Sequence, residues 1–373
     1  MYKIFFSFLF WCVVCSPVQA QTMSAVSETV YPELEHLLTL PCGAASITQT
    51  DVEHLVNLVR STASGTSLTM QDRNKATGAA HTFAVHTDLA TLVSYVYNPA
   101  IPAYVTMPSS VRDQQWLTKD TTSALHRLPQ AIQAREPFWV RGSEQETITP
   151  DANTGGYYAY RQDRLIAYMP MGQEDVLVSV SVQPDASDVG RKGCVIGEDG
   201  NWNYLYSEEP GLTKTGLGWV DSYMYYAASV LVFVADPQTK TVRAGSFKWL
   251  NAGWAGMNMV KQGHILNGIK RFASDFISVL ESATMPGPQE LATLRQTLLA
   301  TDENRLREDV TPYLEAMRAS GDAAVNSAPF KTLLASGEYL RTMSKQEMVK
   351  VLVHEFMKKH LGRDAVLQVA KNP

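Results

Sequence analysis

The spacing of apolar residues predicts helices in the first part of the chain. In residues 21–65, Val52, Leu55 and Val59 recur at the spacing of one helical face. The preceding sequence Thr50–Glu53 has the form of a capping box, in which a side-chain oxygen and a glutamate three residues later satisfy free N–H groups. We therefore expect an amphipathic helix to begin at this point.

From about residue 79 the pattern becomes typical of strands. His81–Thr87 and Leu89–Tyr97 are rich in valine, threonine and aromatic residues, and Asn98-Pro99 ends the second run. Residues 107–136 predict a connector with short helices. Further strands are expected at Phe138–Arg141, Tyr157–Arg161, Leu165–Tyr168, Asp175–Val182, Gly193–Ile196, Asn203–Tyr206, Trp219–Ala235 and Thr241–Trp249.

One of these strands shows a strict alternation of apolar and polar residues. From Val178 onward, Asp175–Val182 places valines on one face and serines on the other. That alternation is typical of an antiparallel strand with one face in a core and the other in water. Between Gly193–Ile196 and Asn203–Tyr206, Glu198–Asn201 predicts a hairpin-type turn.

The clearest helical pattern comes after these strands. Ile265, Ile269, Phe272, Phe276 and Leu280 recur at intervals of four, three, four and four residues, which predicts one long amphipathic helix. The sequence Pro286-Gly-Pro ends this helix and is typical of a domain boundary.

The segment after this boundary is predicted to be entirely helical, with about four helices in residues 289–373. Ser344 and Glu347 form a capping box for the last of them, and Met348, Leu352 and Phe356 supply its apolar face.

The order of elements predicts an α+β fold, in which an antiparallel sheet is closed by the long amphipathic helix and followed by an all-helical extension. This order resembles the helix-grip fold of the START and SRPBCC lipid-transfer domains, in which a curved sheet wraps a final helix around a cavity. The resemblance concerns element order alone, and a fold does not fix a function. The expected organisation is a cleaved segment 1–20, an α+β domain 21–285 and a helical extension 286–373.

The first residues have the pattern of a secretory signal. Lys3 precedes the apolar run Ile4–Val14, and Val18-Gln-Ala predicts cleavage after Ala20. The run is about eleven residues long, whereas a transmembrane helix needs about twenty. A membrane anchor and a lipid anchor on Cys12 or Cys15 are the alternatives. We therefore expect a periplasmic or secreted protein without a transmembrane segment.

Charge and cysteine content narrow the functional classes. The chain has a net charge of −5, and loss of Lys3 with the signal makes it −6. With no basic run, nucleic acid is not an expected partner, because its binding depends on phosphate neutralisation. Two cysteines remain after cleavage, Cys42 and Cys194. In an oxidising compartment they are predicted to form a disulfide, with two free thiols as the alternative.

Motifs for catalysis and metal binding are missing from the sequence. It contains neither Gly-x-Ser-x-Gly nor Ser-x-x-Lys, so Lys214-Thr-Gly alone does not indicate a penicillin-binding enzyme. His354-Glu is followed by His360, six residues on, whereas the zinc-protease motif needs four. We predict no metal and no cofactor.

Aromatic residues concentrate between positions 202 and 254, with several asparagines among them. Aromatic rings combined with amides are typical of a pocket that binds a small molecule, although a β-rich core uses aromatics too. The candidate ligand-binding residues are Trp202, Tyr204, Trp219, Tyr223, Trp249, Asn251 and Trp254.

Three functional hypotheses follow. The first is a binding or carrier protein for an apolar or amphipathic small molecule. The second is an envelope structural protein that binds a protein partner through residues 286–373. The third is a hydrolase or isomerase with a scattered acid–base pair, for which Asp175, Glu198 and Asp221 are the carboxylates to inspect.

Overall fold

The computed structural model describes residues 23–151, 154–214 and 218–367. The predicted signal 1–20 lies outside them. Ten strands of the described residues form one large, open and mostly antiparallel sheet, in the order β1-β2-β3-β14-β13-β8-β7-β5-β4, with β15 paired to β14. Its strands are β1 (Ser24–Ala25), β2 (Ser67–Thr69), β3 (Thr77–Val85), β4 (Val111–Trp116), β5 (Phe138–Ile148), β7 (Ala159–Met171), β8 (Glu174–Val182), β13 (Ser222–Asp236), β14 (Thr241–Trp254) and β15 (Met257–Asn258).

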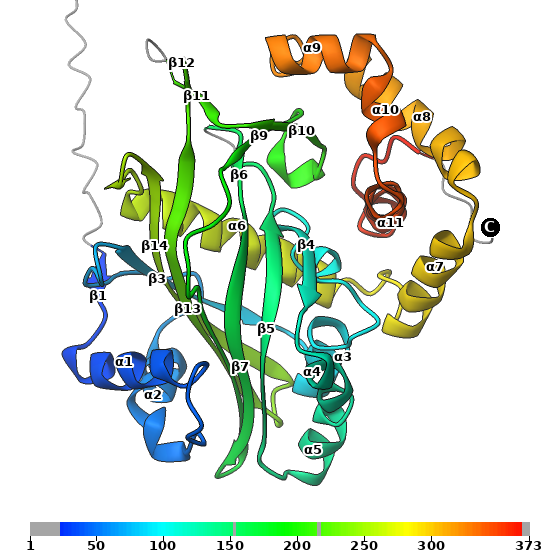
Figure 1. The fold of residues 1–373 in the computed structure, drawn as a ribbon. Coiled ribbons are helices and arrows are strands. Elements are labelled where there is room, and N and C mark those ends of the chain that lie inside the picture. Colours follow the sequence, from blue (N-terminus) through cyan, green and yellow to red (C-terminus); the bar gives the residue numbers. More distant parts are fainter. Residues whose placement is uncertain (1–22, 152–153, 215–217, 368–373) are drawn as a thin grey trace, which may run out of the picture.

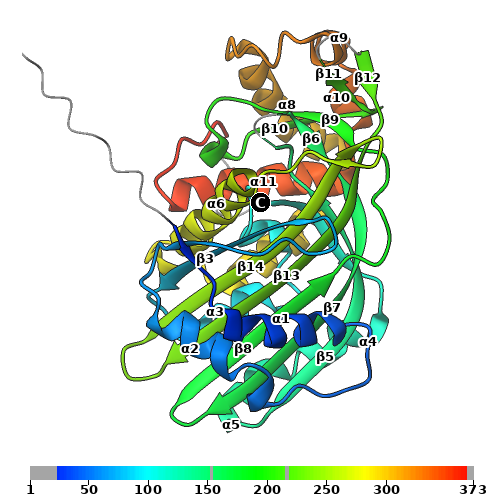
Figure 2. The same cartoon turned by 90° about the vertical axis from the view of Figure 1, so that its left-hand side faces the viewer.

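One face of this sheet, the outer face, packs on two short helices, α1 (Tyr31–Thr39) and α2 (Glu53–Ser61), as Figure 2 shows. The predicted capping box at Thr50–Glu53 is wrong. A 3-10 helix precedes α2, and within it Asp51 accepts the backbone N–H of Thr48 at 2.7 Å. The start of α2 is capped instead by the buried Glu33 of α1, whose carboxylate accepts the N–H groups of His54 and Leu55 at 2.8 Å each.

The opposite, inner face of the sheet is crossed by the long predicted helix, α6 (Gln262–Glu281) (Figure 1). The alternation predicted for β8 is present, but its polar face does not meet bulk water. Val178 and Val180 are buried against the outer helices, whereas Ser179 and Ser181 are buried on the inner face. The serines were expected in solvent because strand alternation does not reveal that α6 covers their side.

The segment between β3 and β5 differs from its prediction. Leu89–Tyr97 was expected to be a strand, yet α3 spans Leu89–Val96. Asp88 caps this helix by accepting the N–H of Thr91 at 2.7 Å, and Leu89, Leu92 and Val93 form its buried side. The cap and the apolar spacing outweigh the β-branched composition. The connector contains the predicted short helices, α4 (Lys119–Leu125) and α5 (Leu128–Ala134), and also the unpredicted strand β4.

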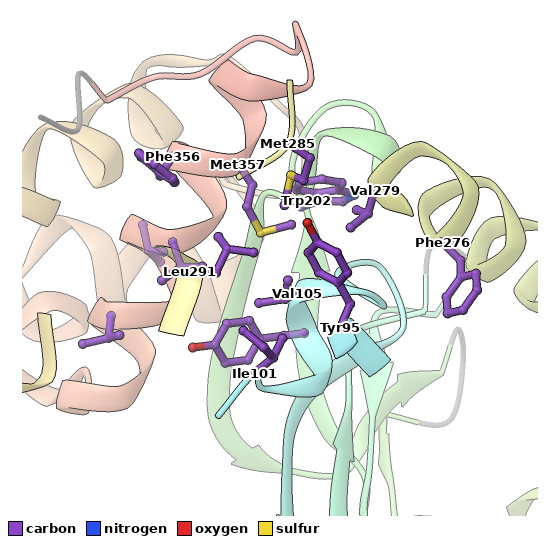
Figure 3. Packing of buried hydrophobic residues seen from close by; sticks show 14 of the residues in the cluster. Tyr95, Ile101, Val105, Trp202, Phe276, Val279, Met285, Leu291, Phe356 and Met357 are labelled. Carbon is purple, nitrogen blue, oxygen red and sulfur yellow. The ribbon is translucent and has the colours of Figure 1, made fainter. Parts of the chain in front are cut away.

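The C-terminal region is helical, as predicted, and its described residues form α7 (Pro288–Ala300), α8 (Glu303–Ala319), α9 (Ala328–Ala335), α10 (Glu338–Thr342) and α11 (Lys345–His360). These helices share one buried cluster with the sheet region. Figure 3 shows Tyr95, Trp202 and Met285 meeting beside Met357 of α11. Ser344 caps α11 by accepting the N–H of Glu347, as expected. None of the helices in the described ranges is long and apolar enough to cross a membrane.

A small sheet links this region to the rest of the chain. It consists of β6 (Gly156–Tyr157), β9 (Arg191–Val195) and β10 (Tyr204–Pro210), and beside it β11 (Leu212–Lys214) pairs with β12 (Gly218–Val220). The structure contradicts the predicted disulfide. Cys194 is a buried free thiol in β9, whereas Cys42 follows α1 near β7 and donates to Asp163 at 3.5 Å. The even number of cysteines predicted a disulfide, but it carries no information about how far apart Cys42 and Cys194 lie in the fold.

Candidate functional site: a cavity between the sheet and helix α6

A cavity of about 1100 Å³ lies between the inner face of the sheet and α6. It exists because the sheet supplies small side chains where α6 crosses it, including Ala227, Ser229 and Ser246. Pockets for small molecules usually measure about 300–1,000 Å³, so this space is large enough for a ligand.

Part of the cavity wall is apolar. Helix α6 contributes Ile265, Ile269 and Phe272, the same stripe that predicted it from sequence. Phe276, one turn further, is fully buried and stacks on Phe233 of β13 with ring centroids 5.9 Å apart. The stripe itself presents no hydrogen-bonding groups and favours the apolar part of a ligand, whereas His264, Asn267 and Lys270 of the same helix add polar groups elsewhere in the lining.

The sheet side of the cavity carries a row of polar residues across four strands. Antiparallel register places Lys248 of β14 opposite Ser229, Ser229 opposite Ser181, and Ser181 opposite Arg164 of β7. The hydroxyls of Ser181 and Ser229 are 2.9 Å apart and hydrogen-bonded. All four residues line the cavity, so a polar row on the sheet lies across the space from the apolar stripe of α6.

At one end of this row, buried carboxylates are fully engaged. The Glu144 carboxylate accepts hydrogen bonds from Gln162 Nε2 and Arg164 Nε, each at 2.6 Å. Gln162 Nε2 also donates to Glu146 at 3.0 Å, and the Tyr160 hydroxyl donates to Glu146. Burial raises the pKa of Glu144, and the adjacent Arg164 guanidinium opposes that rise. These partners account for both carboxylates within the protein itself.

The other end of the row is different. Lys248 makes no hydrogen bond or ion pair with any residue in the described part of the chain. Burial lowers the pKa of its ammonium group, the charge of Glu146 opposes this effect, and the charges of Arg271 and Arg164 add to it. Among the described residues, the three N–H donors of Lys248 therefore lack a protein acceptor, as do those of the solvent-exposed Lys270 in the same lining.

Of the predicted ligand-binding residues, Trp254 lines the cavity. Trp249 lies on the outer face under α2, where its Nε1 donates to the Gln71 carbonyl at 3.0 Å. Trp202 belongs to the core shared with α11, and its Nε1 donates to Asp275 at 3.1 Å. The structure thus distributes these tryptophans over three different surroundings.

Tyr204, Tyr223 and Asn251 also lie outside the cavity lining. The Tyr204 hydroxyl donates to Asp199 at 2.7 Å, and Tyr223 is half-buried beside Tyr225 on β13. Asn251 is buried, and its Oδ1 has no hydrogen-bond partner. Trp219 belongs to β12, but its side chain lies outside the described residues.

The three carboxylates considered for acid–base catalysis do not converge. Asp175 lies opposite Ala235 at one end of β13, whereas Asp221 immediately precedes the other end. At about 3.3 Å per residue, the two ends are roughly 40 Å apart. Glu198 belongs to the turn before β10, and none of the three lines the cavity.

A second group of buried charges lies along α11 rather than in the cavity. Lys350 and Lys358 each contact a glutamate three residues earlier, Glu347 and Glu355, at 2.5 Å. Between them, His354 hydrogen-bonds through Nε2 to the Tyr104 carbonyl at 3.0 Å. Burial lowers the pKa of His354 to about 3, with a further contribution from the Lys350 charge. Only about 10 Å³ of space remains here, so these groups pack the helix and leave no room for a ligand.

The described residues contain no group of three histidine, cysteine, aspartate or glutamate side chains arranged to hold a metal ion. Comparison with known proteins adds no identification, since neither the protein-family models nor the curated proteins include a match to this chain.

Proposed function

We propose that this protein binds, and carries, an amphipathic small molecule in the cavity between the sheet and α6. The observation that carries the proposal is a space of about 1100 Å³ that combines the apolar stripe of α6 with a row of polar side chains on the sheet. An apolar ligand portion would lie against the α6 stripe, while hydrogen-bonding groups would meet the row from Lys248 to Arg164.

The internal bonding of the cavity favours binding over catalysis. In the polar row, the carboxylates of Glu144 and Glu146 are both occupied by hydrogen bonds from Gln162, Arg164 and Tyr160. A general base needs a lone pair directed at the substrate. A long helix crosses an open sheet with a cavity between them, and this arrangement resembles the helix-grip fold. We take the resemblance as support for the binding proposal.

The partner-binding alternative has less support. The apolar residues of α7, α8 and α11 belong to the cluster that includes the sheet region, so these faces are covered by the chain itself. Export remains part of the proposal through the predicted cleavage after Ala20, and the mass of the purified protein would reveal a mature chain starting at Gln21.

Native mass spectrometry of the full chain, expressed with its own N-terminus, tests the proposal. Two glycines of α6 offer a matched pair of variants, because an added side chain meets open space at both. Gly268 lines the cavity, whereas Gly263 is solvent-exposed. We expect a retained small molecule in the wild type and in Gly263→Phe, and its loss in Gly268→Phe. A bare wild-type chain, or equal retention in both variants, would contradict the proposal.

A further inference from the structure

Along the polar row of the sheet, most charged groups have hydrogen-bond partners within the protein, and one does not. The carboxylates of Glu144 and Glu146 have protein donors, and Arg164 contacts both Glu144 and the Ser179 hydroxyl. Lys248 alone in this row has a full charge and no contacting partner among the described residues. Because a buried charge is costly unless it is paired, an ammonium group facing an open cavity is suited to an anion that arrives from outside.

The residues beside Lys248 add neutral hydrogen-bond donors. Ser229 lies directly opposite it on β13, and Ser246 lies two positions earlier on the same face of β14. Both serines line the cavity. A lysine with two neighbouring hydroxyls can donate to the two oxygens of a carboxylate, each of which accepts more than one hydrogen bond.

The charge balance of the wall selects the kind of anion. Glu146 lines the cavity, Glu144 is bonded to Arg164 beside it, and the negative charge of Glu146 reaches Lys248. Because Arg164 is already paired with Glu144, Lys248 is the cation of the sheet side that is left to meet one negative charge. A phosphate dianion would need a second cation, and the other cations of the lining, Lys270, Arg271 and Arg295, belong to α6 and α7. A monocarboxylate therefore fits this wall better than a phosphate.

Apolar residues lie next to the lysine on the same strand. Leu250 follows it on the same face of β14 and packs with Ile265 and Ile269 of α6. A hydrocarbon portion attached to a carboxylate at Lys248 would thus continue directly along an apolar surface.

We infer that Lys248, with Ser229 and Ser246, is the binding site for the headgroup of an amphipathic monocarboxylic acid. This inference rests on the proposed function, because it names the ligand class of that same cavity. It assigns recognition of the negative charge to Lys248, so it can be tested separately from the size and apolarity of the cavity.

Fluorescence titration with dansylaminoundecanoic acid and with its uncharged methyl ester tests the inference on the full mature chain. Lys248→Met keeps the length of the side chain and removes its charge. Lys270→Met is the matched comparison, because Lys270 also lines the cavity but is exposed to solvent, which screens its charge. We expect Lys248→Met to weaken binding of the acid about 10- to 100-fold, as loss of a charged hydrogen bond does. Lys270→Met should change it less than about threefold.

The methyl ester distinguishes loss of carboxylate recognition from loss of the cavity itself, because it has no negative charge. Equal binding of the ester by wild type and Lys248→Met shows that the variant is folded with its cavity intact, so weaker acid binding then supports the inference. If the acid and the ester bind the wild type equally and Lys248→Met changes neither, the headgroup site is wrong while the binding cavity stands. If the wild type binds neither probe, and the native protein also carries no small molecule, both proposals fail.

Discussion

Two lysines are buried in α11 and a third, half-buried, lines the cavity, and the surroundings of these two regions are opposite. In α11, Lys350 and Lys358 each contact a glutamate at 2.5 Å in a region with almost no free space. In the sheet, Lys248 contacts no carboxylate of the described residues and faces a cavity of about 1100 Å³. Burial lowers the pKa of all three lysines, but only the α11 pair has a contacting glutamate that opposes it.

The comparison shows how a structural charge differs from a binding charge. A paired charge in a filled space contributes to one packed arrangement of the chain, and removal of its partner leaves an unpaired charge behind. An unpaired charge beside free space costs stability in the empty protein and recovers that cost when a ligand binds. The two regions should therefore respond in opposite directions to the loss of a charge.

The largest effect is expected in α11. Glu355→Gln removes the charge that pairs with Lys358 and weakens the acceptor for the N–H groups of Val366 and Leu367. We expect the free energy of unfolding to fall by about 3–5 kcal/mol, as for other broken buried pairs. Chemical denaturation measures this loss. Adding Lys358→Met should restore part of it, because no unpaired ammonium is then left.

An exposed pair of the same spacing provides the control. Glu338 and Arg341 are three residues apart in α10, solvent-exposed and 3.5 Å from each other. Glu338→Gln should therefore change the free energy of unfolding by less than about 1 kcal/mol. Similar losses for Glu338→Gln and Glu355→Gln would refute the distinction between buried and exposed pairs.

The next effect is a dependence on pH through His354. Its pKa falls from 6.5 to about 3 on folding, because it is buried near the Lys350 and Lys358 ammonium groups, with Glu347 opposing them. Between these values the unfolded chain binds one more proton than the folded chain, so stability decreases as the pH falls. The slope approaches about 1.4 kcal/mol per pH unit.

The free energy of unfolding of the wild type, measured by denaturation, should therefore be lower at pH 5 than at pH 6.5. The contribution of His354 to this difference is up to about 2 kcal/mol. His354→Gln retains an N–H donor for the Tyr104 carbonyl and cannot titrate, so its stability should decrease less over the same interval. An equal decrease in both proteins would show that His354 does not cause the acid sensitivity.

Sequence patterns predicted the elements whose local signals agree with their tertiary environment. The stripe from Ile265 to Leu280 gave α6, and Ser344 with Glu347 gave the start of α11. Leu89–Tyr97 was misassigned because its composition favours a strand while Asp88 and the buried Leu89, Leu92 and Val93 favour a helix. In that segment, spacing was more informative than composition.

The cavity could not be predicted because strand alternation does not identify which face is covered. Lys248 and Trp249 are adjacent, yet one faces the cavity and the other packs beneath α2. Trp249 was predicted to bind a ligand, whereas no prediction was made for Lys248. The available signal was the alternation of Ser179 and Ser181 in an otherwise apolar strand, which was interpreted as a face in water.

A smaller effect of opposite sign is expected at Lys248. Lys248→Met removes an unpaired buried charge and should stabilise the ligand-free protein by roughly 0.5–2 kcal/mol, the usual range for stabilising substitutions. Because the folded pKa of this lysine is lowered from 10.5, the unfolded state binds more protons between the two values. Wild-type stability therefore rises with pH in that window, and the advantage of Lys248→Met should shrink toward pH 10.5. Destabilisation at pH 7 would contradict the assignment.

The smallest effect is expected from a hydroxyl beside this lysine. The Ser229 hydroxyl is bonded to Ser181 at 2.9 Å and lies opposite Lys248, so it belongs to both the sheet and the proposed headgroup site. Ser229→Ala should lower the free energy of unfolding by about 1 kcal/mol or less, because one neutral hydrogen bond is lost. It should also weaken dansylaminoundecanoic acid binding by about fivefold and leave the methyl ester unchanged. Equal weakening of both probes would mean that Ser229 shapes the cavity without contacting the acid, and would restrict headgroup recognition to Lys248 and Ser246.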